Sequence, residues 1–100
     1  MESIIAQHIT KTPGVCGGRA CIAGHRIRVM DIVVLHEMRG YCAAEISAMY
    51  EGISMADVHA ALAYYFDNVE EIQDEFRKDE VAAKELLIQH PSKVREKLGG

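Results

Sequence analysis

A glycine-rich segment near the N-terminus constrains the fold of this chain more than any other stretch. Residues 10–32 read TKTPGVCGGRACIAGHRIRVMDI and hold two of the three cysteines and four of the eight glycines: Gly14, Gly17, Gly18 and Gly24. Glycine adopts positive φ angles and close chain approaches that a side chain would block. Short apolar pieces between the glycines, such as Ile22 and residues 27–29, indicate hairpin-like strand fragments. The segment therefore predicts a loop that is shaped by its backbone and packs against a helical body.

The composition is that of one folded domain. Of 100 residues, 49% are apolar and 26% are charged, which is typical of a globular protein rather than a disordered one. No apolar run approaches the roughly 20 residues that span a bilayer. The first residues, MESIIAQHI, lack the basic region and long apolar core of a secretory signal peptide. Three cysteines, an odd number, argue against a secreted disulfide framework, so we expect a soluble, cytoplasmic protein.

The net charge of −4 is unevenly spread along the chain. Residues 1–40 carry five basic and three acidic side chains, and residues 91–100 carry three basic and one acidic, so each end has a net charge of +2. Residues 41–90 carry eleven acidic and three basic side chains, a net charge of −8. Such a chain can present a basic patch to one partner and an acidic surface to another.

Apolar spacing predicts the elements outside the glycine-rich loop. Residues 3–9 predict a short strand, and helices are expected at about 30–39, 43–50, 54–67 and 69–89, with a frayed turn at 92–98. The first two helices are expected to end at Gly40 and Gly52.

Two sequence patterns indicate where the later helices begin. Ser54 and Asp57 form a capping box of the S-x-x-D kind at the start of the third helix. Asn68 with Glu71 offers a second N-cap for the fourth helix. The second and third helices, joined by a three-residue turn, form a helix-turn-helix pattern, although any small helical bundle with tight corners produces the same pattern.

Several pieces of the sequence together resemble the small prokaryotic family called domain of unknown function 433, over roughly residues 9–67. The resemblance lies in PGVCGGR at 13–19, Cys21-Ile22, Gly24, RIRV at 26–29, Asp31-Ile32, Glu45-Ile46, Tyr50, Val58 and AALAYY at 60–65. The chain departs from the family pattern at three places. It has Ala20 where proline is common and His25 where threonine is common, and residues 51–53 read EGI where a proline–leucine turn is common.

The resemblance implies both a fold and a function. It implies a mostly α, homeodomain-like three-helix bundle with short N-terminal β-strands, which residues 1–67 would form. The acidic helix and tail at 68–100 lie beyond the resemblance and are predicted from the residues alone. It also implies a VapB-type antitoxin, the non-enzymatic half of a type II toxin–antitoxin pair whose toxin is a PIN-like ribonuclease. Such an antitoxin would form a homodimer and contact operator DNA.

The predicted DNA contacts come from two regions. Affinity for duplex DNA comes largely from Lys and Arg on phosphates, but the third helix, the natural recognition helix, contains neither residue type. The basic side chains lie instead in and after the glycine-rich loop. The predicted DNA-binding residues are Arg19, Arg26, Arg28, Arg39, Ser54, His59 and Tyr64. The alternative for the arginines is that they pair with loop carbonyls and with acids such as Asp31 inside the fold.

The acidic fourth helix is the predicted toxin-binding element. Its thin apolar stripe consists of Ile72, Phe76, Leu86 and Leu87. An acidic amphipathic helix could lie in the basic groove beside the active site of a nuclease and exclude RNA. The alternative is that the stripe packs on the other helices or on a dimer mate. The dimer is expected to use residues 4–9 or this helix.

The cysteines and histidines give little support to metal or enzyme chemistry. Cys16, Cys21, His25 and His8 could supply two thiolates and two imidazoles to zinc, but they lack a second ligand pair at ligand spacing. Small buried thiols in a tight turn explain the same residues. The loop lacks the lysine of a phosphate-binding loop, and no nucleophile lies near a base by spacing. We therefore expect no enzymatic activity, no metal and no cofactor.

Two other functions stay open from the sequence. The chain could be a protein–protein interaction module with a degenerate helix-turn-helix and no DNA binding. A more distant alternative is a small metal-dependent or redox enzyme built on Cys16, Cys21 and His25.

Overall fold

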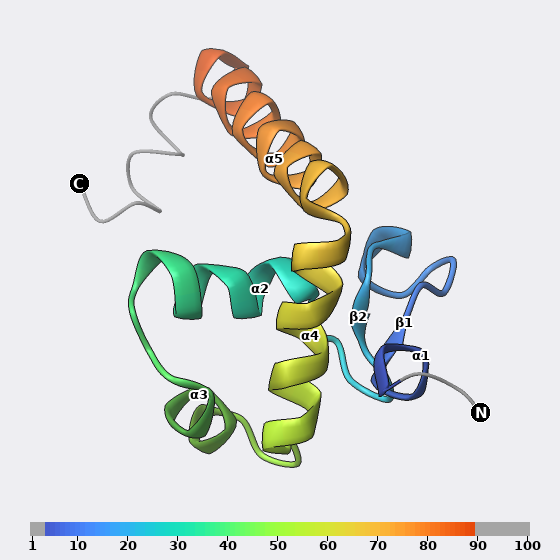
Figure 1. The fold of residues 1–100 in the computed structure, drawn as a ribbon. Helices are drawn as coiled ribbons and strands as arrows, with labels where there is room; N and C mark the ends of the chain where they lie inside the picture. Colours follow the sequence, from blue (N-terminus) through green and yellow to red (C-terminus); the bar gives the residue numbers. More distant parts are fainter. Residues whose placement is uncertain (1–3, 90–100) are drawn as a thin grey trace.

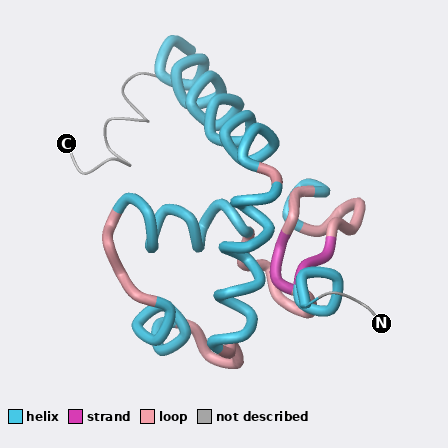
Figure 2. The backbone as a smooth tube through the Cα atoms, in the orientation of Figure 1, coloured by secondary structure: helices cyan, strands magenta, loops and turns pink. Residues whose placement is uncertain are grey.

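The computed structural model describes residues 4–89, which are mostly helical and contain one small two-stranded antiparallel sheet (Figures 1 and 2). In chain order the elements are α1 (Ile4–His8), β1 (Ile9–Thr10), the 3-10 turn η1 (Cys16–Gly18), β2 (Cys21–Ile22), α2 (Val29–Val33), the π-helical turn η2 (Val34–Met38), α3 (Ala43–Met49), α4 (Met55–Asp67) and α5 (Val69–Gln89). The predicted turn at 92–98 lies outside the described residues. None of the described helices is long and apolar enough to cross a membrane.

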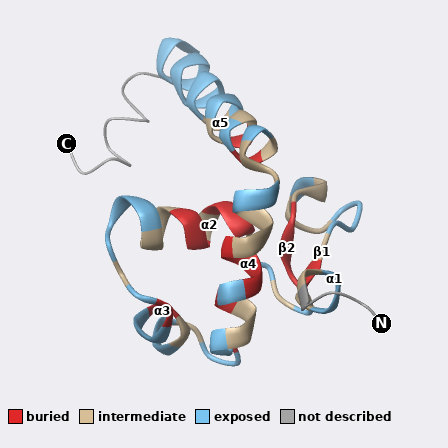
Figure 3. Ribbon diagram, viewed as in Figure 1, coloured by how far each residue is buried: buried red, intermediate tan, exposed pale blue. Residues whose placement is uncertain are grey.

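Helix α4 lies at the centre of the fold. It contacts α1, α2, α3, both strands and the start of α5, so α2 and α3 lie on one side of it and the strands with α1 on the other (Figure 1). The core that surrounds it consists of Ile9, Ala20, Ile22, Val29, Met30, Ile32, Val33, Ala43, Ile46, Ile53, Val58, Ala60, Ala61, Leu62 and Ile72. Burial is accordingly concentrated on α2, α4 and the two strands (Figure 3).

The glycine-rich segment forms the backbone-shaped loop that the sequence predicts. Strand β1 pairs with β2, and the Ile22 amide donates to the carbonyl of Ile27, which closes the predicted hairpin. All four glycines of the segment have positive φ. Gly17 and Gly18 follow one another at +65° and +79°, and Cys16 before them also has a positive φ of +52°. Three such residues in succession form a turn that bulky residues rarely adopt.

The helices that follow begin and end largely where the sequence predicts. Gly40 and Gly52 have positive φ just past the ends of η2 and α3. The Ser54 side chain accepts from the Asp57 amide while Asp57 accepts from the Ser54 amide, which confirms the capping box. The first predicted helix ends in a wider turn, because the Arg39 amide donates to a carbonyl five residues back.

Two local predictions were wrong. The described part of the predicted strand at 3–9 is the helix α1, and only its last residue belongs to β1. Tertiary contacts override the β preference here, because α1 packs on α4 and the His8 Nδ1 lies 2.7 Å from the Asp57 carboxylate. Asn68 does not form the predicted side-chain cap, because its side-chain amide donates to the Tyr64 carbonyl at the end of α4. Helix α5 nevertheless begins at Val69 as predicted, and the Asn68 carbonyl accepts from the Ile72 amide.

Helix α5 consists of a packed half and an exposed half. Ile72 is fully buried, and Phe76 is partly buried against the core. Every residue from 80 to 89 is exposed (Figure 3). The first half therefore belongs to the same packed body as residues 4–67, while residues 80–89, the distal half, extend away from it.

Replacing Ile72 by alanine should lower the free energy of unfolding by about 2–5 kcal/mol, because the truncation leaves a cavity in the core. The matched control is Ile88→Ala, the same change at a side chain that is 81% exposed on the same helix. The control should change stability by less than about 0.5 kcal/mol. Urea unfolding followed by circular dichroism measures both, and equal effects would contradict the division of α5 into two halves.

Candidate functional site

Two of the predicted DNA-binding arginines converge on one acidic residue of α5. The Arg19 guanidinium lies 2.8 Å from Asp79, and that of Arg28 lies 3.8 Å from the same carboxylate. Arg28 also donates to both carboxylate oxygens of Asp31, at 3.1 and 2.8 Å. The pairing with Asp31 is the alternative that the sequence left open for these arginines. Both guanidinium groups therefore join the glycine-rich loop to the rest of the fold.

The ion pairs change the titration of the groups that form them. The hydrogen bond from Arg19 holds the pKa of Asp79 below its usual value, against the opposing effect of burial. The hydrogen bonds to Asp79 and Asp31 raise the pKa values of Arg19 and Arg28 respectively. The charges of Arg19, Arg28 and Asp79 are therefore present at neutral pH.

Arg26 and Arg39 differ from the two paired arginines. Both are exposed, and neither forms an ion pair with residues 4–89. Among the described residues, no carboxylate therefore neutralises the charge of either of these two predicted DNA-binding arginines.

The predicted recognition helix α4 offers a limited surface. Ser54 is used as the N-cap, and His59 is exposed. The Tyr64 hydroxyl donates to Glu71 at 2.6 Å, and burial together with this contact raises the pKa of Tyr64 above its usual value. Ala60, next to His59 on the same helix, is fully buried. Two of the three predicted side chains of α4, Ser54 and Tyr64, therefore form hydrogen bonds inside the fold.

The predicted toxin-binding stripe is divided between the two halves of α5. Ile72 is fully buried in the core and Phe76 is partly buried against it, which for these two residues is the alternative that the sequence left open. Leu86 and Leu87 are 46% and 37% exposed. The exposed apolar side chains of the distal half are Val81, Leu86, Leu87 and Ile88.

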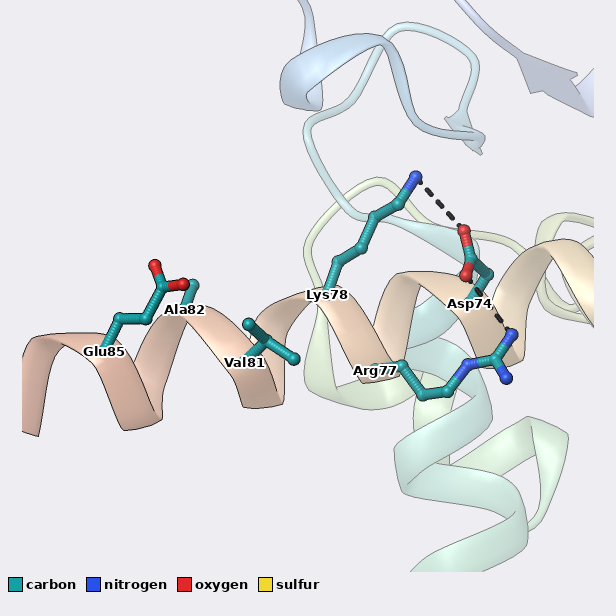
Figure 4. A pocket seen from close by; sticks show the side chains of 6 residues that line it. All are labelled: Asp74, Arg77, Lys78, Val81, Ala82 and Glu85. Atoms are coloured by element: carbon teal, nitrogen blue, oxygen red, sulfur yellow. Dashed lines mark hydrogen bonds and ion pairs between the residues drawn. The ribbon is translucent and has the colours of Figure 1, made fainter.

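A shallow hollow of about 410 Å³ lies along α5 itself. All its lining residues come from this helix, as Figure 4 shows: Asp74, Arg77, Lys78, Val81, Ala82 and Glu85. Two cations of the helix surface pair with Asp74, Arg77 at 3.2 Å and Lys78 at 3.1 Å (Figure 4). The hollow is thus a partly charged helix surface and has no enclosing wall from another element.

Two of the three cysteines lie side by side in the glycine-rich segment. Cys21 is buried, and Cys16 is half-buried beside it. Burial, followed by the neighbouring Cys21, raises the pKa of Cys16, which disfavours the reactive thiolate. Within residues 4–89, no group of three or more His, Cys, Asp or Glu side chains is arranged to hold a metal ion.

Sequence reasoning missed two residues of α5 that face the glycine-rich loop, Glu75 and Asp79. The spacing of Glu71, Glu75 and Asp79 at i, i+4 and i+8 was the available signal, since it brings three carboxylates to one face of a helix.

Comparison with known proteins identifies the family of this chain. The family described as "Protein of unknown function (DUF433)" matches residues 9–65, which include β1, the glycine-rich loop and α2 to α4 up to Tyr65. The chain belongs to the DUF433 family. A similar solved structure is the crystal structure of a DUF433 member protein from Anabaena variabilis.

The Anabaena protein is 42% identical to this DUF433 protein, with a TM-score of 0.59. The alignment covers 67% of this chain and 65% of the Anabaena chain. No curated protein matched the chain.

Replacing Asp79 by asparagine should cost about 0.5–1 kcal/mol of stability at pH 7, a modest amount because the carboxylate is nearly half exposed. The folded-state pKa of Asp79 is lowered from 3.8, so its contribution is fully present above that pH. The contribution is lost as the pH falls through the lower folded-state value. Urea unfolding of both proteins between pH 7 and pH 2 should therefore show curves that converge only at the acid end.

The matched control for this change is Glu85→Gln, on the exposed half of the same helix and without an ion pair in residues 4–89. It should leave stability unchanged within about 0.5 kcal/mol at every pH. A constant difference between wild type and Asp79→Asn across the pH range would contradict an ion-pair role.

Proposed function

We propose that this DUF433 protein is a non-enzymatic antitoxin that binds a PIN-like ribonuclease toxin through the distal half of α5. The observation that carries the proposal is the group of exposed apolar side chains on that half, at the end of a helix that is acidic as a whole. The resemblance to a VapB-type antitoxin supplies the class of partner, and the structure supplies a surface suited to it.

The apolar part of the proposed interface is grouped on one short segment. Val81, Leu86 and Ile88 are 54%, 46% and 81% exposed. Single exposed apolar residues are ordinary, but several on one unpaired helical segment favour a protein-binding role. An amphipathic helix that lays its apolar side chains in a groove is a common mode of recognition.

The charge of α5 favours a basic partner. Over residues 69–89 the helix carries seven acidic and three basic side chains, a net charge of −4. A ribonuclease lines its substrate groove with basic residues, so an acidic helix is complementary to that groove in charge. The same helix, once bound, would exclude RNA from it.

We interpret α2, α3 and α4 as the helix-turn-helix unit of a homeodomain-like fold, with an altered DNA-facing side. The packing of α1 and the strands on α4 favours DNA contacts outside the recognition helix. We therefore assign operator contact to Arg26 and Arg39. Dimerisation through residues 4–9 or α5 stays part of the proposal, because operator half-sites favour twofold proteins.

The second candidate function is a protein-binding module that does not bind DNA. The observation that favours it is the pairing of Arg19 and Arg28 with acids of the fold, which leaves two of the four predicted DNA-binding arginines without an ion pair among residues 4–89. Both candidates share the partner-binding role of α5 and differ in DNA binding.

Replacing both Leu86 and Leu87 by glutamate should abolish capture of the toxin encoded beside this gene and restore its ribonuclease activity. The expected loss of affinity is at least about hundredfold, because two exposed apolar contacts are replaced by charges at the interface. Co-purification and a ribonuclease assay measure the effect.

The control for this variant is Met38→Glu, the same kind of change at a methionine of η2 that is 66% exposed. It should leave the complex intact. Unchanged binding by the double leucine variant would exclude the distal half of α5 as the interface. Truncation after residue 80 is a suitable second test, since it keeps Ile72 and Asp79.

Replacing both Arg26 and Arg39 by glutamate should weaken binding to the DNA upstream of the gene by at least about tenfold and reduce the salt dependence of binding. The matched control is Arg77→Glu, an arginine of α5 whose side chain is 71% exposed. Fluorescence anisotropy across a salt series measures both. Unchanged binding by the double variant removes these arginines from the interface, and no specific binding by the wild type supports the second candidate function.

A further inference from the structure

A cleft of about 360 Å³ separates the glycine-rich loop from the packed half of α5. One wall contains Lys11, Arg19 and the turn at Gly17–Gly18, and the other contains four charged side chains of α5. Unlike the hollow on the surface of α5, this cleft is formed by two elements that are far apart in the sequence.

The cationic side chains of the cleft already have partners. Lys11 pairs with Glu71 at 2.9 Å, and Lys78 pairs with Asp74 at 3.1 Å. Arg19 pairs with Asp79, just outside the cleft, at 2.8 Å. All three cations that line the cleft are therefore paired, so a lining side chain without a partner has to be an acid.

That unpaired charge belongs to Glu75. Its side chain lines the cleft, and the residue is only 7% exposed. Its Oε1 atom is buried and has no hydrogen-bond partner among residues 4–89. Burial, the largest cause, raises the pKa of Glu75, while the nearby Arg19 opposes the rise. A buried carboxyl group without a donor is costly, so a ligand that supplies one would be bound favourably.

We propose that this cleft binds a cationic nitrogen group, a guanidinium or a primary ammonium, whose N–H groups donate to Glu75. Such a group neutralises the Glu75 carboxylate through charge-assisted hydrogen bonds. The volume of the cleft is near the lower end of small-molecule sites and suits a group of side-chain size.

Other ligand classes fit the cleft less well. An anion would meet three carboxylates and cations that are already paired. A metal ion would require a set of ligands, and no three His, Cys, Asp or Glu side chains in residues 4–89 are arranged to hold one. An apolar group would leave Glu75 without a donor. The cationic nitrogen is the ligand chemistry that supplies what the site lacks.

The test is a titration of the full, ¹⁵N-labelled chain with propylguanidinium and with butylammonium, followed by backbone amide shifts. Saturable shifts are expected at Gly17, Gly18 and residues 71–78. Butanol and butyrate, which match the probes in size but lack the cationic nitrogen, should produce no saturable shifts at these amides. Equal responses to butanol or butyrate would overturn the proposal.

The variant that tests the role of Glu75 is Glu75→Gln, which keeps the shape and removes the charge. Binding of both probes should weaken by about tenfold or more, because a charged hydrogen bond is lost. The matched control Glu85→Gln, exposed on the distal half of α5, should bind like the wild type. Unchanged binding by Glu75→Gln would overturn the proposal. Glu75→Leu is a second variant for the same measurement, and folding of each is checked from its amide spectrum.

A second arm of the experiment identifies where the cationic group comes from. It measures the affinity of the Glu75→Gln chain for the proposed toxin. A weaker complex, together with competition by propylguanidinium, assigns the site to a Lys or Arg side chain of that partner. An unchanged complex with probe binding intact assigns it to a small cationic molecule. Both results support the ligand chemistry.

The two proposals can fail separately. The probe titration uses the isolated chain, so its failure overturns the cleft proposal and leaves toxin binding by α5 untouched. The leucine variants of the distal half test toxin binding without altering the cleft.

Discussion

The burial of α4 is the constraint on which the rest of this structure depends. Helices from both sides of the fold, two short strands and the start of α5 all cover one 13-residue helix. Its two successive small residues, Ala60 and Ala61, are completely buried, and small side chains let neighbouring elements approach closely. A helix covered in this way serves as the support of the fold. Few of its side chains stay exposed for contact with a partner.

The ion pairs between loop and helix solve a second problem, which is how to hold a loop whose shape comes from glycine. A run of positive φ angles lacks the regular hydrogen bonds of a helix or sheet, so it needs fixed points at its ends. Arg19 and Arg28 provide them by pairing with Asp79, and Lys11 adds a contact to Glu71. These pairs join residues about 50 to 60 positions apart in the sequence. The glycine-rich loop and α5 consequently form the two walls of one cleft.

Local signals in the sequence predicted much of the fold. The positive φ of the loop glycines, the hairpin at residues 20–29, the capping box of Ser54 and the extent of α5 follow from short-range rules, and the structure confirms them. The helix α1 was not predicted, because its cause is a contact with Asp57, 49 residues away. The burial of Ile72 was missed for the same reason, since a thin apolar stripe does not reveal which part of it packs.

The candidate sites were harder to predict than the fold. Charge alone could not tell Arg28, which is paired inside the fold, from Arg26, which is exposed two residues earlier. Glu75 and Asp79 each have an acidic neighbour in the sequence, so the composition did not show that these two lie on the same face of α5. Which arginine is paired and which acids face the loop both depend on which elements pack against each other in the fold. The composition of a single segment does not contain that information.

The division of α5 also bears on how its distal half stays ordered. An isolated helix of about ten residues is marginal in water, because its first turn is costly to nucleate. In this chain the helix is nucleated where Ile72 packs, and the distal turns are added by propagation alone. A partner that binds them meets a segment already wound into shape, so less ordering entropy opposes association. The strength of such a complex would then depend on how firmly α5 is anchored to the core, several turns away from the surface that the partner contacts.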